Sequence, residues 1–95
     1  MEPMIRGLLE KILDKILEPS NLENLSKTYD VFRPIIKSKE DALFGEVVGT
    51  FTERYCQLML SLKRFPTNNE LTELFDIITR RADEIRSKIL MATST

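Results

Sequence analysis

The sequence predicts a small all-α domain: a four-helix bundle in which a long antiparallel hairpin of the last two helices joins two shorter N-terminal helices. Apolar residues recur at steps of three and four along most of the 95 residues, which is the period of an amphipathic helix. Serine or threonine capping signals precede three of these runs. Only 3 glycines and 4 prolines are present, so few positions oppose a helix.

The first helix is expected over residues 3–18. Pro3 suits a first helical position, since its missing N–H is not needed there. Pro19 disfavours helical backbone at Glu18 and stops the helix. The apolar residues cover about half of the circumference, wider than an ordinary stripe; they are Ile5, Leu8, Leu9, Ile12, Leu13, Ile16 and Leu17.

The second helix is expected from residue 21 to about residue 33, after the capping motif Ser20-x-x-Glu23. Pro34 interrupts its apolar pattern. The helix therefore either stops near Arg33 or kinks and continues to Ile36. We favour a stop or a loosened last turn.

The third and fourth helices are expected over residues 39–63 and 68–90, after the motifs Ser38-x-x-Asp41 and Thr67-x-x-Glu70. Their apolar seams share a 4-3-4-3-4 spacing, which is typical of helices that pack side by side. The two seams are Phe44, Val48, Phe51, Tyr55, Leu58 and Leu62, and Leu71, Phe75, Ile78, Ala82, Ile85 and Ile89. Because a short turn joins them, they predict an antiparallel hairpin about 35 Å long. Together the four helices predict a helix content of about three quarters.

Residues 1–91 are expected to form a single domain, and residues 92–95 a flexible C-terminal tail. The lone Cys56 excludes an intramolecular disulfide and a cysteine-cluster metal site, and a reducing cytoplasm is the default for such a chain. The longest charge-free run has eight residues, Tyr55 to Leu62, against about 20 needed to span a bilayer. Acidic residues within the first apolar segment argue against a signal peptide. We therefore expect a cytoplasmic protein without a membrane span.

A stripe of small residues follows one side of the third helix: Ala42, Gly45, Gly49, Thr52 and Cys56. Two glycines inside a helix cost about 1 kcal/mol each relative to alanine, so a compensating contact is expected. Either another helix, from this chain or from a partner, approaches this face closely, or ordinary packing within the chain uses the space, for example through the broad face of the first helix.

The wide apolar face of the first helix, around Leu9, Leu13 and Leu17, is the second candidate interface. A helix lying on a membrane surface would carry an excess of lysine and arginine on its polar face. Here three basic residues balance three acidic ones: Arg6, Lys11 and Lys15 against Glu10, Asp14 and Glu18. The face is better suited to contact with protein, within the chain or with a second chain.

A basic cluster offers an alternative function. Lys63 and Arg64 end the third helix, and Arg80 and Arg81 lie on the fourth. However, acidic residues alternate with these arginines, and Asp76–Arg80 and Glu84–Lys88 are i,i+4 pairs in the favourable order. Such a pattern is typical of a solvated, salt-bridged helix face. The net charge of −1 likewise gives no reason for non-specific nucleic-acid binding.

No catalytic, cofactor or metal signature is present. The chain has no histidine, so Cys56 lacks the usual base of a thiol nucleophile. The pair Glu70 and Glu73 has no matching second unit for a metal site, and no glycine-rich phosphate loop occurs. We therefore predict a non-enzymatic helical module for protein–protein contact, acting as a homodimer or as a small subunit of a complex. The alternative is a nucleic-acid-associated protein that uses the basic cluster.

Overall fold

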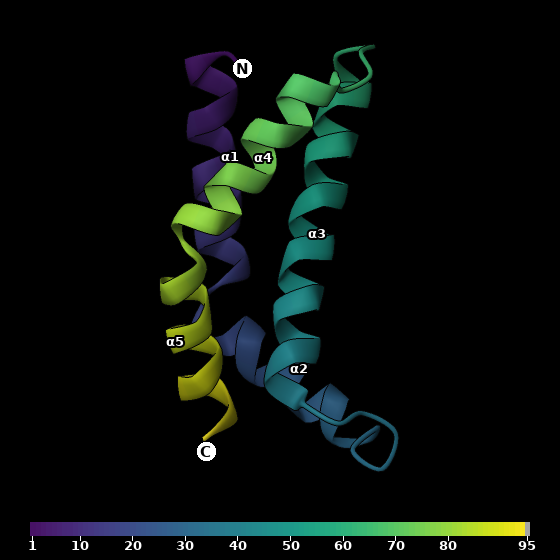
Figure 1. Cartoon of the computed structure of the whole chain (residues 1–95), viewed down its shortest axis with the longest axis vertical. Coiled ribbons are helices and arrows are strands. Elements are labelled where there is room, and N and C mark those ends of the chain that lie inside the picture. Colours follow the sequence, from purple (N-terminus) through teal and green to yellow (C-terminus); the bar gives the residue numbers. More distant parts are fainter. Residues whose placement is uncertain (95) are drawn as a thin grey trace.

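The computed structural model describes residues 1–94, of which 79% are helical and none lies in a strand (Figure 1). The predicted all-α class and helix content are confirmed, but the described residues form five helices instead of four. They are α1 (Pro3–Ile16), α2 (Pro19–Asp30), α3 (Lys39–Ser61), α4 (Asn68–Arg80) and α5 (Ala82–Thr93). No helix within residues 1–94 combines the length and apolar character needed to cross a membrane.

Two of the three predicted caps are present. The Ser38 hydroxyl accepts a hydrogen bond from the backbone N–H of Asp41 at 3.2 Å. Thr67 and Glu70 form a complete capping box, with both reciprocal bonds at 3.1 Å. The predicted Ser20 cap is wrong, because Pro19 already occupies the first position of α2, where its fixed φ and missing N–H are favourable.

The second helix stops before Pro34, which is the favoured one of the two alternatives. α2 ends at Asp30, and residues 31–35 form turns. Within them the carbonyl of Phe32 accepts bonds from the N–H groups of Ile35 and Ile36 at 2.8 and 3.1 Å. Proline cannot continue the helical ladder, so this looser arrangement replaces a last helical turn.

The predicted single helix over 68–90 is interrupted at Arg81, whose φ and ψ are −103° and 11°. α4 ends there and α5 begins at the next residue. α5 also reaches Thr93, and Ala92 is buried, so the predicted boundary at residue 92 falls inside this helix. Thr95, the last residue of the predicted tail, lies outside the described residues.

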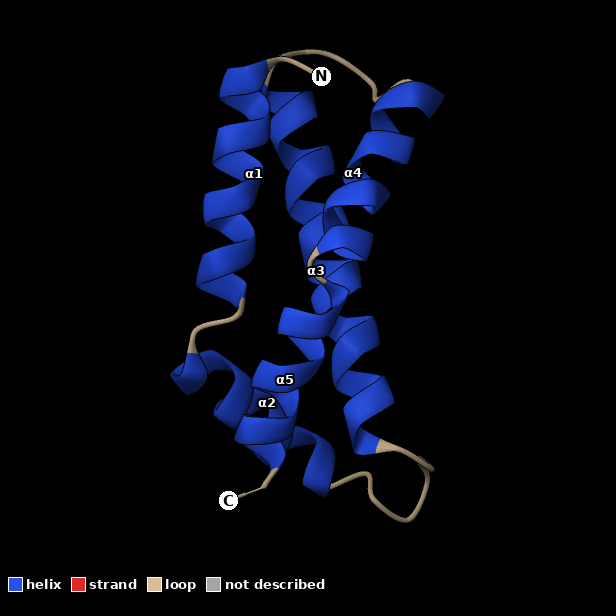
Figure 2. Ribbon diagram, turned by 60° about the vertical axis from the view of Figure 1, so that its left-hand side comes forward, coloured by secondary structure: helices blue, strands red, loops and turns tan. Residues whose placement is uncertain are grey.

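The helix α3 runs along most of the molecule, whose dimensions are 40 × 22 × 20 Å. It packs on α1, α2 and α5, and α5 also packs on α2. Figure 1 shows α4 slanting away from α3 after the turn, and Figure 2 shows α2 and α5 gathered at the other end. The bend at Arg81 therefore gives α4 and α5 different neighbours.

The buried side chains of α3 follow the predicted seam only at Phe51 and Tyr55. They occur at every fourth residue: Leu43, Val47, Phe51, Tyr55 and Met59. Four residues turn a helix by about 400°, so this stripe winds slowly and faces different helices at its two ends. Leu58 is only partly buried, and Leu62 is half exposed.

The seam expected on the fourth helix is also displaced. Ile78, Ile85 and Ile89 are buried as predicted. The predicted burial of Phe75 is wrong, because its side chain is 47% exposed. Leu74 and Ile77 are buried in its place. The bend at Arg81 divides the pattern between two helices, α4 and α5.

Phe51→Ala should lower the free energy of unfolding by about 3–5 kcal/mol, since it empties a fully buried position. Phe75→Ala removes the same atoms from an exposed position and should cost under about 1 kcal/mol. Urea denaturation monitored by circular dichroism measures both. Equal losses for the two variants would contradict the core described here.

Candidate functional site

The predicted interface residues of α1 lie in the core. Leu9 and Leu13 are fully buried within the single chain, and Leu17 is almost so. They pack in the same cluster as residues of α3 and α5. Leu9 and Leu13 thus have no free surface for a second copy in this fold.

The glycines of α3, by contrast, are exposed. A Cβ atom added at Gly45 or at Gly49 would meet, within 4 Å, no atom beyond the adjacent residues and the nearby backbone of α3 itself. The first helix therefore does not use this face, contrary to one of the two alternatives. Ala42, Thr52 and Cys56 are partly buried. We call these five residues the small-residue face.

This face presents few unsatisfied polar groups. The Thr52 hydroxyl donates to the carbonyl of Val48 at 2.8 Å, so its polar atom is already occupied. Glu40 and Asp41 lie in the first turn of α3, and Lys63 and Arg64 follow its last turn. The ends of the face therefore carry opposite charges, although Asp41 and Arg64 also pair within the chain, with Arg86 and Glu70.

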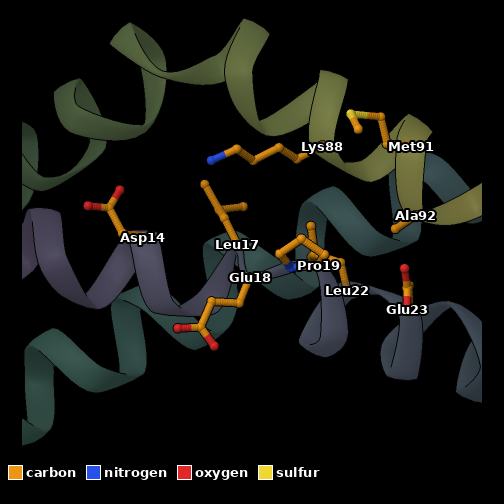
Figure 3. Close-up of a pocket in the computed structure, with 9 residues that line it drawn as sticks. All are labelled: Asp14, Leu17, Glu18, Pro19, Leu22, Glu23, Lys88, Met91 and Ala92. Atoms are coloured by element: carbon orange, nitrogen blue, oxygen red, sulfur yellow. The ribbon is translucent and has the colours of Figure 1, made fainter.

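A second surface is a half-open groove of about 560 Å³ between α1, α2 and α5 (Figure 3). Its apolar lining is Leu17, Pro19, Leu22, Met91 and Ala92, and its charged lining is Asp14, Glu18, Glu23 and Lys88. We call this surface the α1–α2–α5 groove. The sequence alone does not reveal this groove, because its residues come from three helices whose packing no local pattern predicts.

Arg81 joins the bend to α1. Its guanidinium donates to Glu84 at 3.0 and 2.8 Å, to Asp14, and to the carbonyl of Glu10 at 3.5 Å. Lys88 donates to the same Glu84 carboxylate at 2.8 Å. Hydrogen bonds from Arg81, and then from Lys88, lower the pKa of Glu84 to about 2. The bond to Glu84 likewise raises the pKa of Arg81.

The basic cluster is not one surface. Arg80 is exposed and pairs with Asp76 at 2.9 Å, as the i,i+4 spacing predicts. Arg81 was expected on the same solvated face, and this is wrong: only 15% of its side chain is exposed. Arg64 donates to both carboxylate oxygens of Glu70 at 3.2 and 3.0 Å. Lys63 adopts a left-handed backbone conformation (φ 57°) at the end of α3.

The two carboxylates considered for a metal are engaged elsewhere. The carboxylate of Glu70 accepts a hydrogen bond from the backbone N–H of Thr67, and this bond lowers the pKa of Glu70. Burial acts in the opposite direction, and the charge of Arg64 lowers the pKa further. Glu73 pairs with the amino group of Met1 at 2.9 Å. No group of three or more metal-ligating side chains converges within residues 1–94.

Arg81→Met should lower the free energy of unfolding by about 1–3 kcal/mol, since it removes the hydrogen bonds that a largely buried guanidinium donates to Asp14 and Glu84. Arg80→Met, one residue earlier, removes only an exposed pair and should cost under about 1 kcal/mol. Thermal and urea unfolding would compare the two variants. A loss no larger for Arg81→Met than for Arg80→Met would show that the contact with α1 contributes nothing.

The Glu84 carboxylate should make the free energy of unfolding depend on pH in the acidic range. Its folded-state pKa of about 2 lies below the ordinary value, so it contributes stability above the ordinary pKa that is lost as the pH falls toward 2. The unfolding free energy of Glu84→Gln should therefore fall less between pH 5 and 2 than that of the unchanged protein. Urea titrations across this range measure both slopes, and parallel curves would contradict the expectation.

Comparison with other proteins does not assign this chain to a family. No protein-family model, curated protein or solved structure matches it. Its function must be argued from its own surfaces.

Proposed function

We propose that the chain is a non-enzymatic protein–protein interaction module that acts as a homodimer, with the small-residue face of α3 at the contact. The observation that carries the proposal is the open space beside Gly45 and Gly49. Each glycine costs about 1 kcal/mol of helix stability, and no contact within the chain compensates for it. A second helix that approaches closely would do so.

The face is suited to an antiparallel copy of itself. In a two-fold contact the same surface meets itself, so an antiparallel crossing near Gly49 and Thr52 sets the first turn of one α3 beside the end of the other. Asp41 and Lys63 then approach each other twice, once on each side of the axis. Opposed helix dipoles add to the attraction.

The crossing also has a complementary shape. Leu60 is half exposed near the end of α3, and Ala42 lies near its beginning on the same side. An antiparallel arrangement brings Leu60 of one copy over Ala42 of the other. A bulky side chain over a small one is the packing that close helix crossings use.

Two further expectations belong to this proposal. α4 and α5 act as one helix bent at Arg81, so the chain remains a four-segment bundle with a bent hairpin. The protein works in the cytoplasm, where Cys56 on the contact face stays a thiol.

The nucleic-acid alternative has less support. It relies on Lys63, Arg64, Arg80 and Arg81, yet three of these side chains are already paired with carboxylates. Counterion release requires cations that are free to meet phosphates. A titration with DNA or RNA at moderate salt should therefore give no micromolar binding, whereas tight, salt-sensitive binding would favour the alternative.

Sedimentation equilibrium at tens of micromolar should give twice the chain mass of 11.0 kDa. Gly49→Leu should convert the dimer to a helical monomer, because the added side chain separates the two copies. Within the chain the position is open, so the monomer should keep or gain stability. Circular dichroism checks that the monomeric variant is helical, and unfolding measurements check its stability.

Gly7→Leu is the matched control. Gly7 lies on α1 and its missing Cβ also faces open space, but it is outside the small-residue face. It should leave the dimer intact. A monomeric unchanged protein would reject the homodimer, and dissociation by both variants would reject the small-residue face as its contact.

A further inference from the structure

The α1–α2–α5 groove combines an apolar floor with an exposed apolar edge. Leu17 and Leu22 form the floor and are almost fully buried, while Met91 is 73% exposed. A volume of about 560 Å³ is within the range of about 300–1,000 Å³ typical of ligand sites. Apolar side chains of an occupant could therefore be buried there.

The charges of the groove are not balanced. Asp14 is paired with Arg81, and Lys88 with Glu84. Glu18 and Glu23 have exposed side chains, and neither carboxylate has an ion pair or side-chain hydrogen bond among residues 1–94. Figure 3 shows Glu23 on the α2 side of the groove and Lys88 extending along the opposite side toward Asp14, whereas the Glu18 carboxylate, at the junction of α1 and α2, points away from Lys88 and Met91. Two free negative charges thus border an apolar floor.

We propose that this groove binds a basic amphipathic helix from another protein. An apolar stripe with anchors at i, i+3 or i+4, and i+7 would cover Leu17, Leu22 and Met91, as in helix-in-groove recognition. Lysine or arginine beside the stripe would meet Glu18 and Glu23. An acidic helix of equal hydrophobicity would be repelled by the same two carboxylates.

This inference does not rest on the homodimer. The groove uses α1, α2 and α5, whereas the proposed dimer contact lies on α3. Gly49→Leu, the monomerising variant, should therefore bind such a helix as well as the unchanged protein does. The two proposals can fail separately.

The probe is a fluorescein-labelled amphipathic 14-residue peptide of leucine and lysine, titrated with the full chain and followed by fluorescence anisotropy. Saturable, salt-weakened binding is expected. The double variant Glu18→Gln, Glu23→Gln should bind at least about tenfold more weakly, a loss equivalent to about 1.4 kcal/mol. A leucine–glutamate peptide of the same length should not bind.

Two matched controls separate the groove from general acidity. Glu2→Gln with Asp83→Asn removes the same charge from exposed positions outside the groove, and should leave binding unchanged. Met91→Lys should abolish binding, while Leu90→Lys, the adjacent exposed position of α5, should not. Far-UV circular dichroism confirms that each variant is folded.

Three results would overturn the proposal. One is the absence of saturable binding to the unchanged protein. Another is an equal loss in the groove and control variants, which would indicate non-specific attraction. The third is a self-associated species that Met91→Lys dissociates, since the occupant would then be a second copy, inserting its exposed apolar and basic segment 31–37.

Discussion

The contact between Arg81 and α1 is the interaction on which the arrangement of the C-terminal half depends. The backbone bends at this residue, and its guanidinium reaches Asp14, 67 residues earlier in the chain. The Arg81 side chain is largely buried, and an unpaired buried charge is costly. The position of the bend and the positions of the carboxylates that pair with Arg81 are therefore coupled. The bend turns α5 onto α2 and α3, and this packing creates the α1–α2–α5 groove.

The two candidate surfaces differ in the kind of evidence that supports them. On the small-residue face, a conformational cost in the helix has no compensation within the chain. In the groove, an apolar concavity carries two carboxylates without partners. In the two proposals, the first surface would meet a copy of itself across a two-fold axis and the second would meet a basic partner. Charge is therefore what distinguishes the occupants proposed for two surfaces that are both poor in polar contacts.

Local chemistry predicted the features that depend on neighbouring residues. The Thr67–Glu70 box, the Ser38 cap and the Asp76–Arg80 pair each involve residues three or four apart, and all are present. The predicted cap at Ser20 is absent, because the neighbouring Pro19 occupies the first position of α2. The exposed Phe75 and the α1–α2–α5 groove could not be predicted, since both depend on which face of each helix meets its neighbours. The apolar rhythm runs through the bend at Arg81 without interruption, so the sequence pattern gives no sign of the bend, and the contact of Arg81 with Asp14 joins residues too far apart for a local pattern to predict.

The network around Arg81 also determines the electrostatics of the groove. Lys88 and Asp14 line the groove, yet each already has an oppositely charged partner in the network. Their charges are thus largely compensated, and Glu18 and Glu23 dominate the field that an approaching helix meets. In a homodimer joined through α3, two such grooves would be held at a fixed separation. A partner with two basic segments of matching spacing would bind the second groove at a high effective concentration, so dimerisation would favour bivalent partners without any change in the groove itself.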